Sequence, residues 1–364
     1  MKIVVNQKNL KRALGIVERI VSKNTTLPIL NNILFKTENG RLRLSATNLE
    51  IGINYSIGSK IEETGEVAVP ARIISDFISN ISDEKIKLIV NNNNILNINS
   101  EHYKTKILGF DAKDFPLIPK IKTKPLLSMP VKILKNSLIS VMDSVALSEA
   151  RPELAGIFVT FENDKIVFAS TDSFRLTEKN FDLKNSTKQS FIIPRNTVTE
   201  LIRIAGDLEG DIFINLNDNQ ISFSNEDFEI VSRLVDGNYP DYKKVIPDKF
   251  ISKIIINKND LEKNIRLAGL FASNISDIKI QCLETKTKIV SSNSDKGEIE
   301  TEIKSILKNQ SFEVSLNYHY ILDGLKIIDT EEVVLEYTGQ GSPLVLKPGN
   351  DRKDLVYLIM PLRA

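Results

Sequence analysis

Apolar residues recur at helical spacing in three separate parts of the chain. Each set occupies positions i, i+4, i+7 and i+11, which lie on one face of an α-helix. The sets are Leu10, Leu14, Val17 and Val21; Leu134, Leu138, Val141 and Val145; and, more weakly, Leu261, Ile265, Ala268 and Ala272. The pattern predicts three amphipathic helices with related apolar faces.

Between these helices apolar and polar residues alternate, as they do in half-buried strands. The segment ILFKTENGRLRLS has Asn39 and Gly40 between two alternating runs, which is a strong signal for a β-hairpin. The segment GIFVTFENDKIVFAS has Asn163 and Asp164 at the same place. A second helical stripe follows a proline twice: Ile74, Phe77, Ile78 and Ile81 after Pro70, and Val198, Leu201, Ile202 and Ala205 after Pro194. Each part therefore combines two helices with antiparallel strands.

Three landmarks recur with one period and in one order. The first lies at Pro70, Pro194 and Asn317, with intervals of 124 (194 − 70) and 123 (317 − 194). The second lies at Thr47, Thr171 and Ser292, with intervals of 124 (171 − 47) and 121 (292 − 171). The third lies at Pro116, Pro240 and Pro361, with intervals of 124 (240 − 116) and 121 (361 − 240). We therefore expect three homologous α+β domains, each with two helices on antiparallel sheet, over residues 1–122, 123–249 and 250–364.

The composition is that of a soluble globular protein, with 41% apolar and 26% charged residues. No stretch approaches the roughly 18 apolar residues that a membrane-spanning helix needs. The N-terminal MKIVVNQKNLKRAL turns polar too soon for a signal peptide. A single cysteine, Cys282, excludes a disulfide framework and fits a reducing compartment. We expect a cytoplasmic protein with no membrane partner.

The motifs of common catalytic and metal sites, namely the P-loop, HExxH, CxxC and GxSxG, are absent from the sequence. The two histidines, His102 and His319, stand far apart, and neither is near a nucleophile or a ligand cluster. No pair of carboxyl groups lies in an apolar context that would separate their pKa values. Distant residues could still assemble a catalytic site, but the sequence favours a protein that is not an enzyme and binds neither metal nor cofactor.

Charge is balanced overall, with 48 Lys and Arg against 47 Asp and Glu, so binding to a polyanion would need a local concentration of cations. Basic residues recur on the expected helices: Lys8, Lys11, Arg12, Lys132, Lys135 and Lys258 on the first helix of each repeat, and Arg72, Arg195 and Arg203 on the second. Any one of them can be explained as a solubilising surface residue. Together, on helices that share a surface, they would contact phosphates without reading bases.

At several segments the chain resembles the bacterial DNA polymerase III beta subunit family, the sliding clamps. The resemblance covers the whole chain and is carried by MKIVVNQKNLKRAL, TLPILNNIL (26–34), VPAR (69–72), STDSFRL (170–176), LVDGNYPDY (234–242) and YLIMPLRA. It implies a processivity factor, a head-to-tail homodimer that closes as a ring around duplex DNA of any sequence. Helices would line the hole and sheets would form the outer wall, so DNA is held by topology and a few inward cations suffice.

The resemblance also implies a seam between the first domain of one chain and the third domain of the other. The candidates are Tyr103, Thr105 and Ile107 on one face of HYKTKIL, and Leu270 and Phe271 at the end of the third domain's first helix. A paired edge strand would also remove an aggregation hazard. The alternative for Leu270 and Phe271 is burial within their own domain.

Members of the family bind the polymerase III alpha subunit, the clamp loader and other proteins with a clamp-binding motif through short peptides. The peptides dock in a pocket between the second and third domains. Carried over, that pocket comprises Arg151, Leu154, Thr171, Arg175, Leu176, Pro240, Lys244, Val245, Asn317, Tyr320, Ile359, Met360, Pro361, Leu362 and Arg363. An apolar slot rimmed by a few donors suits a peptide with bulky apolar anchors.

The chain departs from the family's pattern at several of these positions. Where the family commonly has T-D-G-H-R, this chain has Ser173 and Phe174, and Lys244 replaces a common arginine. Near the rim of the hole Asn24 replaces an arginine, so that the adjacent Lys23 becomes a further DNA-facing candidate. These departures concern the peptide preference and individual DNA contacts, and they leave the expected fold unchanged.

The apolar end of the chain, YLIMPLRA, is expected to be a core strand followed by a pocket wall, with Pro361 matching Pro116 and Pro240. Two other classes of protein stay open at this point. One is a scaffold that binds peptides without forming a ring, and the other is a hydrolase built from tandem domains.

Overall fold

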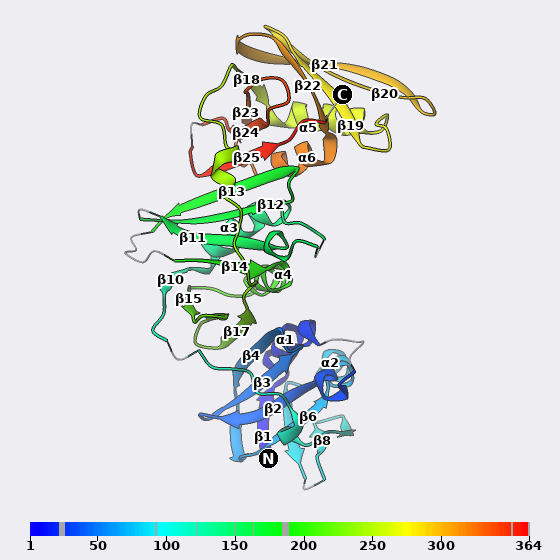
Figure 1. Ribbon diagram of the computed structural model, residues 1–364. Coiled ribbons are helices and arrows are strands. Elements are labelled where there is room, and N and C mark those ends of the chain that lie inside the picture. Colours follow the sequence, from blue (N-terminus) through cyan, green and yellow to red (C-terminus); the bar gives the residue numbers. More distant parts are fainter. Residues whose placement is uncertain are drawn as a thin grey trace. The chain divides into compact units, whose positions relative to one another are not determined.

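The computed structural model divides the chain into two compact units (Figure 1). Unit 1 contains Met1–Lys135 and Asn196–Leu234, and unit 2 contains Asn136–Arg195 and Val235–Ala364. The structure describes residues 1–21, 26–91, 93–121, 123–148, 150–162, 164–183, 189–350 and 352–362. No helix in these ranges is long and apolar enough to cross a membrane.

Six α-helices belong to the described residues, two for each expected domain. They are α1 (Gln7–Val17), α2 (Ala71–Asn80), α3 (Val131–Met142), α4 (Arg195–Ile204), α5 (Lys258–Gly269) and α6 (Tyr318–Lys326). Within unit 1 α1 packs against α2, and within unit 2 α5 packs against α6. The α+β class with paired helices is confirmed.

Unit 1 contains two antiparallel sheets. The first, in spatial order, is β5 (Lys60–Glu63), β1 (Lys2–Asn6), β7 (Lys85–Val90), β8 (Ile95–Asn99) and β9 (Lys104–Leu108). The second is β10 (Leu127–Pro130), β15 (Asp211–Leu216), β16 (Gln220–Ser224), β17 (Phe228–Arg233), β4 (Ile51–Gly58), β3 (Arg41–Thr47), β2 (Asn32–Glu38) and β6 (Glu66–Pro70). The second sheet therefore combines strands of the first expected domain with strands of the second.

Unit 2 is built on one twelve-stranded sheet. Its spatial order is β14 (Ser190–Pro194), β11 (Gly156–Glu162), β12 (Lys165–Thr171), β13 (Arg175–Asp182), β25 (Leu355–Ile359), β24 (Leu344–Pro348), β23 (Glu332–Tyr337), β18 (Ser252–Asn257), β21 (Gly297–Asn309), β20 (Lys286–Asn293), β19 (Asp277–Cys282) and β22 (Phe312–Asn317). Strands β20 and β21 form a long hairpin (Figure 1). This sheet joins strands of the second and third expected domains.

Two strand pairs make these sheets continuous across the expected domain boundaries. We call the pair β4–β17 in unit 1 the first junction and the pair β13–β25 in unit 2 the second junction. Ionic contacts accompany both. Arg41 pairs with Asp227 at 2.5 Å at the first junction, and Lys179 pairs with Asp354 at 2.6 Å at the second. Backbone ladders, not flexible linkers alone, therefore connect the repeats.

The 124-residue period appears in the element boundaries. Strands β2, β3, β4 and β6 and helix α2 each begin 124 residues before β11, β12, β13, β14 and α4, as in 175 − 51 for β13 and β4. The hairpin prediction is confirmed, because Asn39 (φ 51°) and Gly40 (φ 74°) both adopt the positive φ of a type I′ turn. Asp164 also has a positive φ of 62°, while Asn163 lies outside the described residues.

In all three repeats the last apolar position of the expected stripe lies three or four residues beyond the end of the helix. Val21, Val145 and Ala272 lie beyond the ends of α1, α3 and α5. After Val17 the chain tightens into a 3₁₀ helix, η1 (Glu18–Ile20), which still keeps the stripe close to the core. Val145 and Ala272 are buried and Val21 is half-buried. The periodicity identified the buried positions correctly and the helix ends incorrectly.

A returning segment covers an edge strand in each repeat. Phe110 N donates to Ala68 O of β6 at 2.8 Å, Val235 N to Ile192 O of β14 at 3.0 Å, and Leu362 N to Ser315 O of β22 at 2.9 Å. The three acceptors lie two residues before the landmark positions 70, 194 and 317. Unpaired strand edges invite association with other chains, so the same cover is used three times.

The positions of these covering segments show that Pro361 is not equivalent to Pro116 and Pro240, although the sequence pattern predicts this equivalence. Pro116 follows the end of β9 by eight residues (116 − 108) and Pro240 follows the end of β17 by seven (240 − 233). Pro361 follows the end of β25 by only two (361 − 359). It is therefore not the counterpart of the other two prolines, and the tail stands instead where the edge covers of the first two repeats stand.

Candidate functional site

A cavity of about 240 Å³ opens beside the second junction, within unit 2. Its lining comes from 3₁₀ helix η4 (Pro152–Leu154) and its neighbours, the turn between β12 and β13, the segment around η5 (Tyr242–Val245) and the end of β25. The lining residues are Arg151, Leu154, Thr171, Ser173, Arg175, Leu176, Pro240, Asp241, Tyr242, Val245, Leu358 and Met360. Four separate segments thus converge on one hollow.

Eight of the fifteen expected pocket residues line this cavity. They are Arg151, Leu154, Thr171, Arg175, Leu176, Pro240, Val245 and Met360. Sequence reasoning missed Ser173, Asp241, Tyr242 and Leu358. The first three lie inside the quoted segments STDSFRL and LVDGNYPDY and could have been included. Leu358 is found only through the register of β25, in which it faces Leu176.

The other expected pocket residues lie elsewhere or outside the described part. Lys244 is exposed and pairs with Asp241 at 3.0 Å, and Ile359 is fully buried in the core. Asn317 caps α6 by accepting from His319 N at 2.9 Å. Pro361 and Leu362 line a neighbouring hollow of about 680 Å³. Arg363 lies outside the described residues, and Tyr320 does not line the cavity but lies against Arg175, which does.

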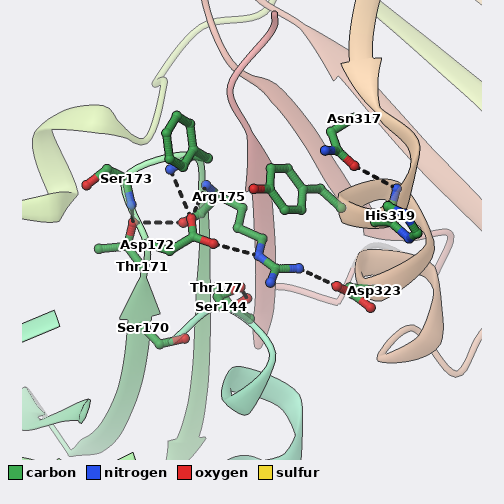
Figure 2. A network of polar contacts seen from close by, with 12 residues as sticks. Ser144, Ser170, Thr171, Asp172, Ser173, Arg175, Thr177, Asn317, His319 and Asp323 are labelled. Atoms are coloured by element: carbon green, nitrogen blue, oxygen red, sulfur yellow. Dashed lines mark hydrogen bonds and ion pairs between the residues drawn. The ribbon is translucent and has the colours of Figure 1, made fainter. Parts of the chain in front are cut away.

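The turn that carries the cavity wall is held by its own side chains (Figure 2). Thr171 Oγ1 donates to Arg175 O at 2.7 Å and accepts from Ser173 N at 3.1 Å. Asp172 Oδ1 accepts from Phe174 N at 2.9 Å and from Arg175 N at 3.0 Å. Such turns are typical of Thr and Asp. Ser173 adopts a φ of 76°, a backbone conformation that glycine adopts more readily than serine.

Arg175 is held on three sides (Figure 2). Its Nε donates to Asp172 Oδ2 at 3.0 Å, its Nη1 donates to Asp323, and the guanidinium lies over the Tyr320 ring at 4.5 Å. The side chain is 13% exposed. Burial acts to lower the pKa of Arg175, but Tyr357 and the two carboxylates overcome it, so the pKa is raised. Arg175 is therefore a fixed wall of the cavity that joins β13 to α6.

Aromatic packing supports the other wall. Tyr239 stacks on Phe158 with ring centroids 4.8 Å apart, and Tyr242 packs edge-on against both rings. Tyr242 Oη donates to Glu178 at 2.7 Å, and burial, reinforced by that carboxylate, raises the pKa of Tyr242. The phenol thus stays neutral. A rigid, largely apolar slot with a few polar groups at its rim accepts bulky apolar side chains of an extended peptide.

Met360 forms the partition between this cavity and the neighbouring hollow, since it lines both. Its N–H donates to Phe174 O at 2.8 Å, and two residues later Leu362 N donates to Ser315 O. The end of the chain is therefore tied to the cavity turn on one side and to β22 on the other. A thioether at this position can adapt to differently shaped side chains.

The expected DNA-facing cations are mostly exposed. Lys8, Lys11, Arg12, Arg72, Lys132, Arg195 and Arg203 are exposed, whereas Lys135 and Lys258 are half-buried. Lys23 lies outside the described residues. Lys258 Nζ donates to Ile328 O at 2.5 Å, just beyond the end of α6. This bond fixes the Lys258 ammonium to the protein, so it is less available to a phosphate than Lys8 or Lys132.

The expected seam residues divide into exposed and buried ones. Tyr103 is exposed and Leu270 is 64% exposed, while Thr105 and Phe271 are half-buried. Ile107 is buried within unit 1, against its own repeat. Burial in its own domain therefore does not account for Leu270. Strand β9 lies at the edge of its sheet.

Groups that could carry other chemistry are few. Within the described ranges, no cluster of three or more His, Cys, Asp or Glu could hold a metal ion. His102 is exposed, as expected, but its Nδ1 lies 2.8 Å from Asp83 Oδ1. Cys282 is buried in the core of unit 2, and burial raises its pKa to about 12.

Three α+β repeats that share sheets across their boundaries, with an apolar cavity at one junction, define a protein of the three-domain clamp class. Family models for the DNA polymerase III beta subunit match residues 1–119 (N-terminal domain), 128–241 (central domain) and 243–363 (C-terminal domain). The chain belongs to the DNA polymerase III beta subunit family.

Individual relatives agree with this assignment. The beta sliding clamp of Staphylococcus epidermidis is 31% identical over 359 residues, 95% of each chain, and that of Staphylococcus aureus is 30% identical over 358 residues, again 95% of each. The crystal structure of the DNA polymerase sliding clamp from Bacillus subtilis superposes with a TM-score of 0.96 at 26% identity, covering 100% of this chain and 99% of that one. The beta subunit from Thermotoga maritima gives 0.93 at 26%, with the same coverage.

Proposed function

We propose that two copies of this chain close head to tail into a ring around duplex DNA. The ring serves as a processivity factor with no catalytic activity of its own. It tethers the polymerase III alpha subunit, the clamp loader and other motif-bearing proteins through the cavity at the second junction. Its three domains span residues 1–122, 123–249 and 250–364.

The observation that carries the ring is the repetition of one junction. The fourth strand of one repeat pairs with the last strand of the next, as β4–β17 and again as β13–β25. The strands left at the ends of this series are β21 and β9. Among the described residues, β9 pairs only with β8, and residues 297–304 of β21 pair only with β20. A heterologous contact of this kind closes when the rotation per domain divides the circle.

The two observed registers support a third of the same kind at the proposed seam. Val231 faces Gly52 at the first junction, and Leu358 faces Leu176 at the second. When the repeats are aligned by their strand registers, Lys106 of β9 corresponds to Val231 and Leu358, and Glu298 of β21 corresponds to Gly52 and Leu176. At the seam between two copies Lys106 would therefore face Glu298, and Lys104 would face Glu300. All four side chains are exposed, although Glu300 also pairs with Lys288 at 2.5 Å. Opposite charges directly across two strands favour their pairing.

The DNA contact follows from the helix cations and from topology. Exposed lysines and arginines on the helices, such as Lys8 and Lys132, would meet phosphates of any sequence. Because the ring encloses the duplex, strong phosphate binding is not needed and would slow sliding. Tyr103, Thr105, Leu270 and Phe271 would flank the strand pair at the seam.

The partner site follows from the cavity. Its apolar lining of Leu154, Leu176, Val245, Leu358 and Met360 accepts two or three bulky side chains. Thr171 and Arg175 hold the wall that receives them. The exposed Phe174 stands beside this wall, which favours partner peptides with an apolar residue next to the main anchors.

Ring formation is tested on circular DNA. The protein is loaded onto nicked circles with its cognate clamp loader and ATP, and half of the sample is linearised in moderate salt. We expect retention on circles and loss from linear DNA. Equal retention on both forms would exclude a topological link and favour a non-ring scaffold.

The seam is tested by charge reversal. Lys104→Glu with Lys106→Glu should shift the protein toward monomer in light scattering, because both proposed pairs become repulsive. Adding Glu298→Lys and Glu300→Lys to the same chain should restore the dimer. If the four-fold variant remains monomeric while folded by circular dichroism, the proposed register is wrong.

A further inference from the structure

The backbone arrangement around the peptide cavity at the second junction has a counterpart at the first junction. Thr47 Oγ1 donates to Ile51 O at 2.9 Å and accepts from Leu49 N at 3.0 Å. Asn48 Oδ1 accepts from Glu50 N at 3.1 Å and from Ile51 N at 2.8 Å. These are the bonds of the Thr171–Arg175 turn, 124 residues earlier. Leu49 even has the same φ of 76° as Ser173.

The segments on either side of this turn repeat as well. Arg233 N donates to Glu50 O at 3.1 Å, as Met360 N does to Phe174 O. Leu30 N donates to Leu27 O at 3.0 Å within η2 (Pro28–Asn31), as Leu154 N does to Arg151 O within η4. All the partners in the first set lie in unit 1. The frame that holds the cavity is therefore present twice.

The floor of the repeated frame is filled. Gly52 and Ile118 stand at the positions of Leu176 and Tyr242, 124 residues earlier. A Cβ on Gly52 would lie 2.6 Å from Ile118 Cγ2, so the isoleucine occupies the space that the cavity leaves open. Any ligand here would rest on a shallow surface and not in a pocket.

The rim of the repeated frame is apolar where the rim of the cavity is polar. The cavity has Arg151, Ser173 and Asp241 at its rim. The residues 124 positions earlier are Leu27, Leu49 and Leu117, whose exposed fractions are 47%, 50% and 96%. Exposed leucines at all three equivalent positions would together present an apolar surface beside the filled frame.

We propose that these leucines form a second peptide-binding surface, the leucine rim, whose occupant is an extended segment with apolar side chains and one acidic residue. The acidic residue is assigned from charge. Arg233 stands at the position of Met360 and is exposed, and no acidic side chain of the described ranges forms an ion pair with it. A carboxylate of the bound segment would meet this guanidinium beside the leucines. The inference rests on the proposed function, because the class of occupant is taken from the cavity at the second junction.

The leucine rim is tested with a short synthetic peptide that carries three leucines and one aspartate on a glycine and serine background. Full-length protein with ¹³C-labelled leucine methyl groups reports both sites in one titration. Leu27, Leu49 and Leu117 report the leucine rim, and Leu154, Leu176 and Leu358 report the cavity. We expect saturable shifts of the first set, and replacing the peptide's aspartate by asparagine should weaken them by about threefold to fivefold.

Variants separate the two sites. Replacing the rim leucines by serine two at a time, so that the third remains as the reporter, should weaken binding at the leucine rim at least about tenfold and leave the cavity signals unchanged. Leu147→Ser, which alters another exposed leucine at no equivalent position, is the matched control. Arg233→Ala should abolish the preference for aspartate over asparagine. If the proposed function is wrong and the cavity binds no peptide, only the signals of Leu154, Leu176 and Leu358 would fail to shift.

The titration is continued until the cavity is saturated or the peptide reaches its solubility limit. The proposal is overturned if the rim leucines show no saturable shift by that point. It is also overturned if the serine variants bind as tightly at that surface as the parent protein does. Because the three side chains are exposed, their replacement should not impair folding, and the cavity signals confirm this in the same sample.

Discussion

Removal of residues 360–364 tests what the end of the chain contributes. The truncation ends at Ile359 and leaves β25 paired with β13 on one side and β24 on the other. It removes two main-chain hydrogen bonds, from Met360 to Phe174 and from Leu362 to Ser315, each worth about 1 kcal/mol. It also removes three half-buried apolar side chains, of which the larger two, Met360 and Leu362, are worth about 1 kcal/mol each at half the value of full burial.

The sum of these losses is about 4 kcal/mol at most, since a real unfolded chain already buries some of this surface. Unit 2 should therefore still fold, with a midpoint of thermal unfolding lower by about 10 °C. Peptide binding should fall much further, because Met360 is a wall of the cavity. The truncation at Leu362, which keeps both hydrogen bonds, is the matched control.

The measurements are scanning calorimetry and fluorescence anisotropy with a labelled peptide copied from the clamp-binding segment of the cognate polymerase III alpha subunit. We expect the truncation at Ile359 to bind at least about tenfold more weakly than the truncation at Leu362. An unchanged Kd would show that the tail is no part of the partner site. An unchanged unfolding temperature would show that covering the edge of β22 contributes nothing to stability.

Four further predictions concern single residues. Gly324→Ala should lower the free energy of unfolding by about 1–3 kcal/mol in denaturant titrations, because its Cβ would lie 2.5 Å from Tyr357 Cδ1; no change would mean that α6 shifts freely. Cys282 should react with iodoacetamide at pH 8 far more slowly in the native than in the unfolded protein, since burial raises its pKa to about 12. Asp83, whose pKa the Ser100 hydroxyl and His102 lower to about 2, should stabilise the turn at residues 100–103 above its ordinary pKa of 3.8 and lose that effect as pH falls toward 2. His102, whose pKa Asp83 raises, should stabilise the turn below pH 6.5 and lose this effect as pH rises through the raised pKa; an NMR titration of Asp83→Asn should show a lower His102 pKa than in the parent protein.

The sequence was sufficient for those parts of the fold that depend on local patterns. The period of 124, the hairpin at Asn39–Gly40 and the buried stripes of the helices all follow from residues close together in the chain. Helix ends did not follow, because a 3₁₀ turn such as η1 keeps the apolar phase while changing the hydrogen bonds. The tail was misaligned because a proline is a weak marker without the strand that precedes it.

The site was predictable where one short segment supplies several wall residues, as STDSFRL does. It was not predictable where strand register decides, as for Leu358, because nothing local reports which residue of β13 it faces. Nor could the sequence show that Lys258 is held by Ile328 O, or that Ile118 occupies the space beside Gly52. These contacts join residues from distant segments, and only the folded chain brings them together.

The shared sheets have a practical consequence for anyone who cuts this protein into pieces. A fragment limited to residues 128–241 would match one family domain, yet it would separate β17 from β4 and β13 from β25. Two long strand edges would then face solvent, and such edges are prone to aggregate. Expression boundaries chosen from the repeats alone would therefore yield insoluble material, whereas a fragment that keeps each strand with its neighbour across the junction should stay soluble.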